Sequence, residues 1–128
     1  MKTAPITVVE LPTFLRSADM AGITDDERGA LVDFIARHPL AGDLVKDTGG
    51  LRKMRWRRKG GGKRGGYRAI YYFHDFDAPI YAFLAYGKAQ QVDLTPSQKK
   101  AAASMVGEIK ALIRAETKGK RDPSGGDE

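Results

Sequence analysis

The sequence contains no cysteine, which excludes a disulfide framework, thiol catalysis, Fe–S clusters and cysteine-type zinc sites. It has no apolar run approaching the roughly 18 residues of a membrane-spanning helix. The stretch from Met1 to Glu10 lacks the basic-then-apolar order of a signal peptide. These absences predict a soluble cytoplasmic protein with no membrane partner. The 128 residues suffice for one domain and leave little room for a second.

Acidic residues are missing from one segment, between Arg52 and Arg68, which carries nine cations. The chain has 22 Lys+Arg against 16 Asp+Glu, a net charge of +6, and without those nine cations it has 13 against 16, a net charge of −3. Clustered charge on a slightly acidic body favours a phosphate-rich partner, above all nucleic acid. The alternative is a solvated charged hairpin. Aromatic residues within the segment, Trp56 and Tyr67, favour nucleic acid.

The first third of the sequence predicts one strand and two helices. A β-branched run at 6–9 is typical of a strand. Pro12 suits the first turn of a short helix that would carry Phe14, Leu15 and Ala18 on its apolar face. Thr24 followed three residues later by Glu27 forms a capping-box pattern at the start of a second helix, which Pro39 ends.

The middle of the sequence predicts a long-looped β-hairpin. Residues 40–50, rich in glycine and aspartate, are expected to form a loop. From residue 51 the pattern repeats every two residues, and after the glycine-rich basic stretch 60–66 a second β-rich run follows at 67–73. The alternation places Arg52, Met54 and Trp56 on one face of the first strand, and Lys53, Arg55 and Arg57 on the other.

The last third predicts a buried strand, a helix and a tail. The run 80–86 is almost wholly apolar, as in a strand buried on both faces. Thr95 and Gln98 form a second capping box, and residues 117–128 predict a disordered tail behind a domain at 1–116. The whole order is strand, helix, helix, three antiparallel strands and helix, which predicts a small α+β domain. An apolar stripe marks the final helix at Ala102, Met105, Val106, Ile109, Leu112 and Ile113.

Two common motifs are excluded. Lys63 in the glycine loop is followed by Arg64, where a phosphate-binding Walker A loop needs serine or threonine to hold magnesium. His74, Asp75 and Asp77 fall in an ordinary polar turn between strands, so no metal site is predicted.

A resemblance to a known family runs through three stretches: GGLRKMRW at 49–56, GKRGGYRAIYY at 62–72 and YGK at 86–88. They resemble the RelE/HigB toxins of type II toxin–antitoxin systems, within the RelE/ParE superfamily, and most of all the HigB-like members. The resemblance implies a RelE-like fold and a ribosome-dependent endoribonuclease that cuts messenger RNA in the ribosomal A site without a cofactor. It implies as partners the ribosome with its messenger RNA and a cognate antitoxin, expected to be a HigA-like helix-turn-helix protein.

The resemblance also implies a catalytic set. Lys53 and Arg55 match the family's two basic positions on the first hairpin strand, and Arg68 matches the arginine of the second. Lys88 falls where the family usually has a basic residue at the edge of the site. The expected catalytic residues are therefore Lys53, Arg55, Arg68 and Lys88.

The sequence departs from the family pattern at two places. Ala89 stands where RelE-type relatives carry a further arginine. No tyrosine follows Tyr86 to match their C-terminal catalytic tyrosine. Tyr72 and Tyr86 are both candidates to replace it.

The matched residues suit metal-free RNA cleavage, in which the substrate's own 2′-hydroxyl attacks the adjacent phosphate. Lys53 or Arg55 would accept the 2′ proton, a role easier for lysine because arginine almost never gives up its proton. Arg68 would bind phosphate oxygens through its planar fork, and Lys88 would protonate or stabilise the leaving oxygen. The other cations would dock ribosomal RNA without sequence choice: Arg52, Arg57, Arg58, Lys59, Lys63 and Arg64.

Two other functions remain open. The related ParE toxins are linked to poisoning of DNA gyrase, which needs no RNA chemistry. A non-catalytic RNA-binding module would use the same cations and aromatic residues. Lys53, Arg55 and Arg68 together favour the nuclease.

Overall fold

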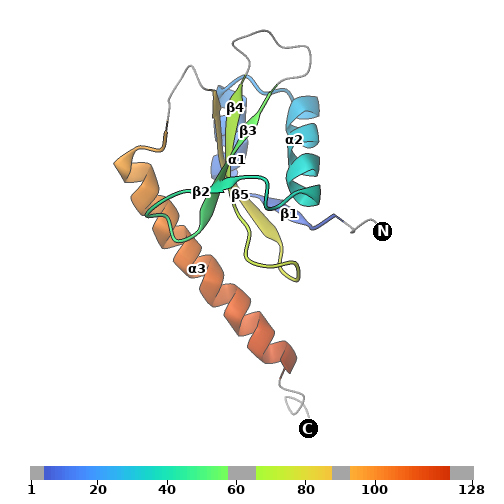
Figure 1. Ribbon diagram of the computed structural model, residues 1–128, viewed down its shortest axis with the longest axis vertical. Helices are drawn as coiled ribbons and strands as arrows, with labels where there is room; N and C mark the ends of the chain where they lie inside the picture. Colours follow the sequence, from blue (N-terminus) through green and yellow to red (C-terminus); the bar gives the residue numbers. More distant parts are fainter. Residues whose placement is uncertain (1–4, 58–65, 88–92, 122–128) are drawn as a thin grey trace.

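A computed structural model describes residues 5–57, 66–87 and 93–121, with the side chains of its last helix described to Glu116. The predicted α+β class is confirmed: the described residues form three helices and a five-stranded sheet (Figure 1). In chain order the elements are β1 (Val8–Glu10), α1 (Pro12–Met20), α2 (Asp25–Arg37), β2 (Asp43–Leu44), β3 (Leu51–Trp56), β4 (Tyr67–Tyr72), β5 (Ile80–Gly87) and α3 (Pro96–Arg121).

The sheet has the strand order β1-β5-β4-β3-β2. The expected antiparallel hairpins of β3, β4 and β5 are present, and β1 adds a parallel strand against β5. β3 and β4 pair along their whole length, from Leu51 opposite Tyr72 to Trp56 opposite Tyr67. This register aligns the two strands that carry most of the described cations of the basic segment.

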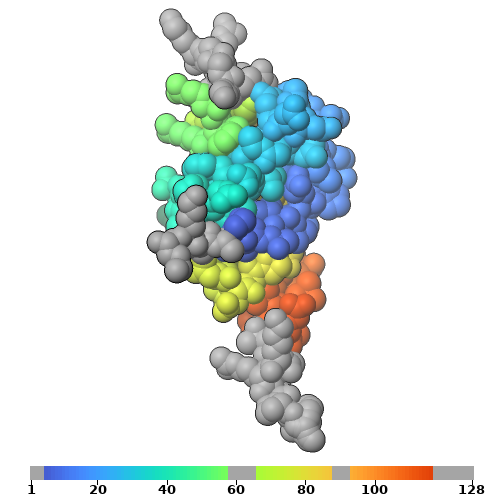
Figure 2. Space-filling view, turned by 90° about the vertical axis from the view of Figure 1, so that its right-hand side faces the viewer, coloured from blue at the N-terminus to red at the C-terminus, as the bar shows by residue number. Residues whose placement is uncertain are grey.

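The two faces of the sheet are covered by different helices. α1 and α2 pack on one face, where Phe14 and Ile35 meet Met54 and Tyr71 in a closed apolar cluster. α3 lies on the other side of the sheet from α2 (Figure 1) and packs through Val106 and its neighbouring apolar residues. Figure 2 looks onto the α1–α2 side, where these helices close over the sheet and β3 lies at the left-hand edge.

α1 also completes the edge of β5 beyond the short strand β1. Leu11 N donates a hydrogen bond to Ala82 O (3.1 Å). Beyond this point, side chains of α1 form the hydrogen bonds to the backbone of β5. Thr13 Oγ1 donates to Phe83 O (2.7 Å), and Ala85 N donates to Ser17 Oγ (2.9 Å). Side-chain hydrogen bonds thus satisfy backbone groups of β5 that no neighbouring strand reaches.

Both predicted capping boxes are confirmed. Glu27 N donates to Thr24 Oγ1 (3.1 Å) and Thr24 N to Glu27 Oε1 (2.9 Å) at the start of α2. The same reciprocal pair joins Thr95 and Gln98 before α3. α3 continues to Arg121, so the start of the expected tail at 117–121 is helical, and the rest of that tail lies outside the described residues.

Three details differ from the sequence-based expectation. Leu15 and Leu112, assigned to apolar helix faces, are 39% and 61% exposed. The expected loop at 40–50 contains strand β2, which pairs with β3 through Asp43 and Leu44 alone. A strand of two residues is too short to show an alternating pattern, so its sequence carries no strand signal.

Tertiary hydrogen bonds hold β2 in place. Tyr71 Oη accepts from Gly42 N (2.9 Å) and donates to Pro39 O (2.7 Å), while Arg52 Nη1 donates to Gly42 O (2.7 Å). A Cβ at position 42 would lie 3.0 Å from Tyr71 Oη and 3.1 Å from Arg52 Cβ. Glycine is therefore required there by close approach, and the pairing of β2 depends on a tyrosine far along the chain.

Candidate functional site

Three polar side chains form a row across the centre of the sheet. Arg55 on β3 lies opposite Arg68 on β4, and Arg68 lies opposite Tyr86 on β5. Residues paired this way have Cα atoms about 5 Å apart and side chains on the same face. We call Arg55, Arg68 and Tyr86 the polar row. It lies on the α3 side of the sheet, because Ile70 and Tyr72, which share a face with Arg68, pack under α3.

Lys53 lies beside the polar row, two residues before Arg55 on the same strand and face. Its Nζ is 3.4 Å from Asp93 Oδ1, which comes from the segment before α3. The carboxylate of Asp93 is also held by Leu94 N (2.8 Å). That backbone hydrogen bond, with help from Lys53, lowers the pKa of Asp93 below its ordinary value. Asp93 thus stays ionised beside the Lys53 ammonium.

A hollow of about 610 Å³ opens at the edge of β3, where the short β2 ends. It brings together the three described residues of the predicted catalytic set, Lys53, Arg55 and Arg68. Phe34 of α2 and Asp43 of β2 complete its wall with Ala41 and Met54. The spacing of Lys53 and Arg55 along the strand, together with the β3–β4 pairing, is what brings the cations to one place.

Tyr86 and Tyr72 have different surroundings. Tyr86 is 4% exposed, and its Oη has no hydrogen-bond partner within the described part of the chain. Burial, followed by the nearby Asp93 charge, raises the pKa of Tyr86. Tyr72 lies at the far end of β4, and its Oη is 2.9 Å from His74 Nδ1. Of the two tyrosines considered from the sequence, Tyr86 is the one that lies beside the arginines.

The remaining predicted RNA-binding cations fall into three groups. Arg52 shares a face with Met54, opposite to Lys53, and its guanidinium is turned inward to Gly42 O. Its contact with RNA stays a prediction. Arg57 is exposed directly after β3. The others, and the fourth predicted catalytic residue, lie outside the described residues: Arg58, Lys59, Lys63, Arg64 and Lys88.

Asp93 was not found by the sequence analysis. It pairs with a residue 40 positions earlier, and its own segment has no periodic pattern. Elsewhere in the described ranges, no group of three or more His, Cys, Asp or Glu side chains is placed to hold a metal ion. No helix among the same residues has the length and hydropathy needed to cross a bilayer.

A mixed five-stranded sheet with two helices on one face and one on the other is a RelE-like architecture. Residues 8–119 match the family described as the RelE toxin of the RelE / RelB toxin–antitoxin system. The chain therefore belongs to the RelE toxin family, the toxins of a type II toxin–antitoxin system. Membership implies a protein antitoxin as a partner.

Proposed function

We propose that this toxin is an endoribonuclease that cleaves messenger RNA in the A site of the ribosome. The observation that supports this most is the common hollow of Lys53, Arg55 and Arg68. Three cations around one space can bind a phosphate and stabilise the extra negative charge of its transition state. Like charges opposite each other on a sheet cost stability, so Arg55 opposite Arg68 is better explained by an anionic ligand than by folding.

In the proposed reaction the 2′-oxygen of the substrate forms a bond to the adjacent phosphorus as the bond from phosphorus to the 5′-oxygen breaks. Lys53 acts as the neutral amine, after giving its own proton to solvent, and takes the 2′ proton, while the guanidinium groups of Arg55 and Arg68 bind the non-bridging phosphate oxygens. The 5′-oxygen leaves with a proton from Lys88 or from water. The products are a 2′,3′-cyclic phosphate and a 5′-hydroxyl end, and no metal or cofactor takes part.

The proposal extends to the partners. Arg57 and the cations of 58–64 would dock ribosomal RNA, giving binding that weakens steeply with salt. The GGLRKMRW stretch supports a HigB-like subtype and hence a HigA-like antitoxin with a helix-turn-helix fold. A ribosomal target would place the action of the toxin in the cytoplasm.

Primer extension on a defined messenger RNA tests the reaction. Purified protein is incubated with that RNA alone and with ribosomes paused with an open A site. We expect cleavage only with ribosomes, and a fall of about 10²–10³-fold for Arg68→Ala, the effect of losing one oxyanion-type donor. Arg114→Ala, which removes the same charge from an exposed position on α3, should cleave like the wild type.

The opposite results are equally informative. Wild-type protein that leaves messenger RNA intact with and without ribosomes would contradict the proposal. Inhibition of gyrase supercoiling by the same preparation would then identify a ParE-like activity, and RNA binding without cleavage a binding module. Equal cleavage by Arg68→Ala and Arg114→Ala would exclude Arg68 from the chemistry.

A further inference from the structure

The cationic site contains an acid of the chain's own. Asp93 Oδ1 lies 3.4 Å from Lys53 Nζ, and Lys53 is one of the three cations around the hollow at the edge of β3. The proposed reaction uses Lys53 as a neutral amine, whereas the carboxylate of Asp93 pairs with its ammonium form. The free toxin therefore holds an anion at a group that the RNA must reach.

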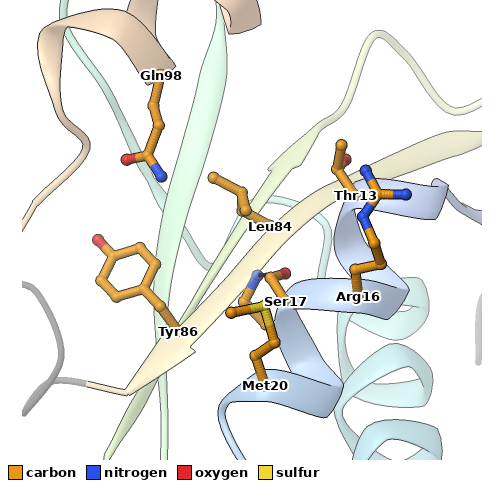
Figure 3. Close-up of a pocket in the computed structure, with 8 residues that line it drawn as sticks. Thr13, Arg16, Ser17, Met20, Leu84, Tyr86 and Gln98 are labelled. Carbon is orange, nitrogen blue, oxygen red and sulfur yellow. Dashed lines mark hydrogen bonds between the residues drawn. The ribbon is translucent and has the colours of Figure 1, made fainter.

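The start of α3 holds Asp93 beside the polar row. Asp93 Oδ1 also accepts a hydrogen bond from Leu94 N (2.8 Å), and the side chain of Leu94 is buried in the apolar cluster under α3. Figure 3 shows Gln98, in the first turn of α3, reaching toward the hydroxyl end of Tyr86 on β5. The Asp93 charge helps to raise the pKa of Tyr86, behind the larger effect of burial, so the carboxylate lies near Tyr86 as well as near Lys53.

A purely structural role explains this ion pair poorly. The side chains of Lys53 and Asp93 are 31% and 52% exposed, and ion pairs as exposed as this contribute little to stability. A second acid, Asp43, lies opposite Lys53 on β2 and lines the hollow, but the described ion pair of Lys53 is with Asp93.

The charge of Asp93 has a clearer use as a counter-ion. While no RNA is bound, the carboxylate offsets part of the repulsion among the three cations of the site. An RNA phosphate brings the same sign of charge to the same ammonium. Because two anions close to one ammonium repel each other, the phosphate and the carboxylate compete for it.

We propose that Asp93 is an internal competitor of the RNA phosphate. In the free toxin its carboxylate occupies Lys53, and the RNA backbone reaches Lys53 only by displacing it. The affinity for any RNA is thereby lowered, so stable binding needs additional contacts such as those that a ribosome offers. The inference rests on the proposed ribonuclease function and assigns to Asp93 a part in the selection of ribosome-bound over free RNA.

Binding of a short single-stranded 2′-O-methyl RNA, which has no 2′-hydroxyl to react, tests the competition. Asp93→Asn removes the charge and keeps an oxygen that can accept from Leu94 N. At 0.1 M salt it should bind about fivefold more tightly than the wild type, and its slope of log K against log salt should be steeper by about 0.7, the effect of one more neutralised phosphate on a single strand. Fluorescence anisotropy over a salt series measures both quantities.

Two further variants control for charge. Asp33→Asn removes the same charge from an exposed ion pair with Arg37 on α2, and it should bind the RNA as the wild type does. Asp93→Glu keeps the negative charge and should keep the weaker binding. Equal tightening in Asp33→Asn and Asp93→Asn would mean that net charge alone sets the affinity, and would overturn the proposal.

Cleavage on ribosomes with an open A site gives a second readout. Asp93→Asn should lower KM and leave kcat close to the wild-type value, because the carboxylate is already displaced once the RNA is bound. A fall in kcat with unchanged KM would overturn the competition and make Asp93 a supporting residue of the reaction.

The outcomes separate this inference from the proposed function. Ribosome-dependent cleavage by the wild type, with equal RNA affinity and salt slope in Asp93→Asn, would overturn the competitor and leave the ribonuclease intact. Weaker RNA binding by Asp93→Asn would overturn it as well. If the wild type cleaves nothing, the ribonuclease is contradicted, and the anisotropy series still decides whether Asp93 competes with a phosphate.

Discussion

The two faces of the sheet differ in how far they are buried and in the charge they carry. On the α1–α2 face, Phe14, Leu31 and Ile35 are fully buried against β4 and β5, and the buried Tyr71 hydroxyl is hydrogen-bonded. On the α3 face, the helix covers the start of β3 and leaves Arg55 exposed opposite Arg68. One face therefore supplies stability, and the other carries opposed like charges and an unbonded tyrosine hydroxyl that folding alone does not favour.

The largest expected effect on stability comes from a cavity on the α1–α2 face. Ile35→Ala removes a fully buried side chain between α2 and the sheet and should lower the free energy of unfolding by about 2–5 kcal/mol. On the α3 face, Arg55→Ala relieves repulsion from Arg68 and should change the free energy of unfolding by about 0.5 kcal/mol or less. Urea unfolding of both variants makes the measurement. A large loss of stability in Arg55→Ala would contradict the inference that the α1–α2 face, and not the opposed arginines, supplies the stability.

Two buried tyrosines, Tyr71 on the α1–α2 face and Tyr86 on the α3 face, test the same difference between the faces. Tyr71→Phe leaves Gly42 N–H and Pro39 C=O buried without their partner and should cost about 1–3 kcal/mol of unfolding free energy. Tyr86→Phe removes a hydroxyl without a described partner and should leave stability unchanged or raise it. Thermal unfolding of the two variants side by side compares them. Equal destabilisation would mean that the Tyr86 hydroxyl is bonded in solution.

The two capping boxes allow a matched test, because each starts a helix on a different face of the sheet. Thr24→Ala at α2 and Thr95→Ala at α3 each remove a hydrogen bond to a backbone N–H and should each cost about 1 kcal/mol. Urea unfolding of the two variants measures both losses, and an unchanged stability in either variant would contradict the prediction.

The sequence predicted best where local pattern and tertiary structure agree. Both capping boxes lie within four consecutive residues, so their chemistry is complete in the sequence. Lys53 and Arg55 follow the alternation of β3, and hairpin pairing adds Arg68 because β3 and β4 are neighbours in the chain. The family resemblance rested on these same residues, and the family match confirms the RelE family, while the HigB-like subtype stays a prediction.

The sequence could not predict features that depend on distant parts of the chain. β2 is defined by the hydroxyl of Tyr71, 29 positions after Gly42, and Asp93 meets Lys53 across 40 positions. As an arginine in the basic segment, Arg52 was assigned to RNA binding. The hydrogen bond from its guanidinium to Gly42 O depends on where Gly42 lies in the fold. No periodicity within a segment encodes such contacts, because packing against other segments creates them.

The smallest expected effect concerns Asp93, the one described acid paired with a cation of the site. Its pKa is lowered in the folded protein, chiefly by Leu94 N–H and then by Lys53, relative to about 3.9 in an unfolded chain. The folded state is therefore stabilised above that pH, and the contribution disappears as pH falls through the lower, folded pKa. Because the carboxylate is half exposed, Asp93→Asn should cost about half a kcal/mol or less at pH 7. Urea unfolding at pH 7, 5 and 3 should show the two stabilities converging with acid, and a gap that stays constant down to pH 3 would mean that Asp93 does not stabilise the fold through its charge.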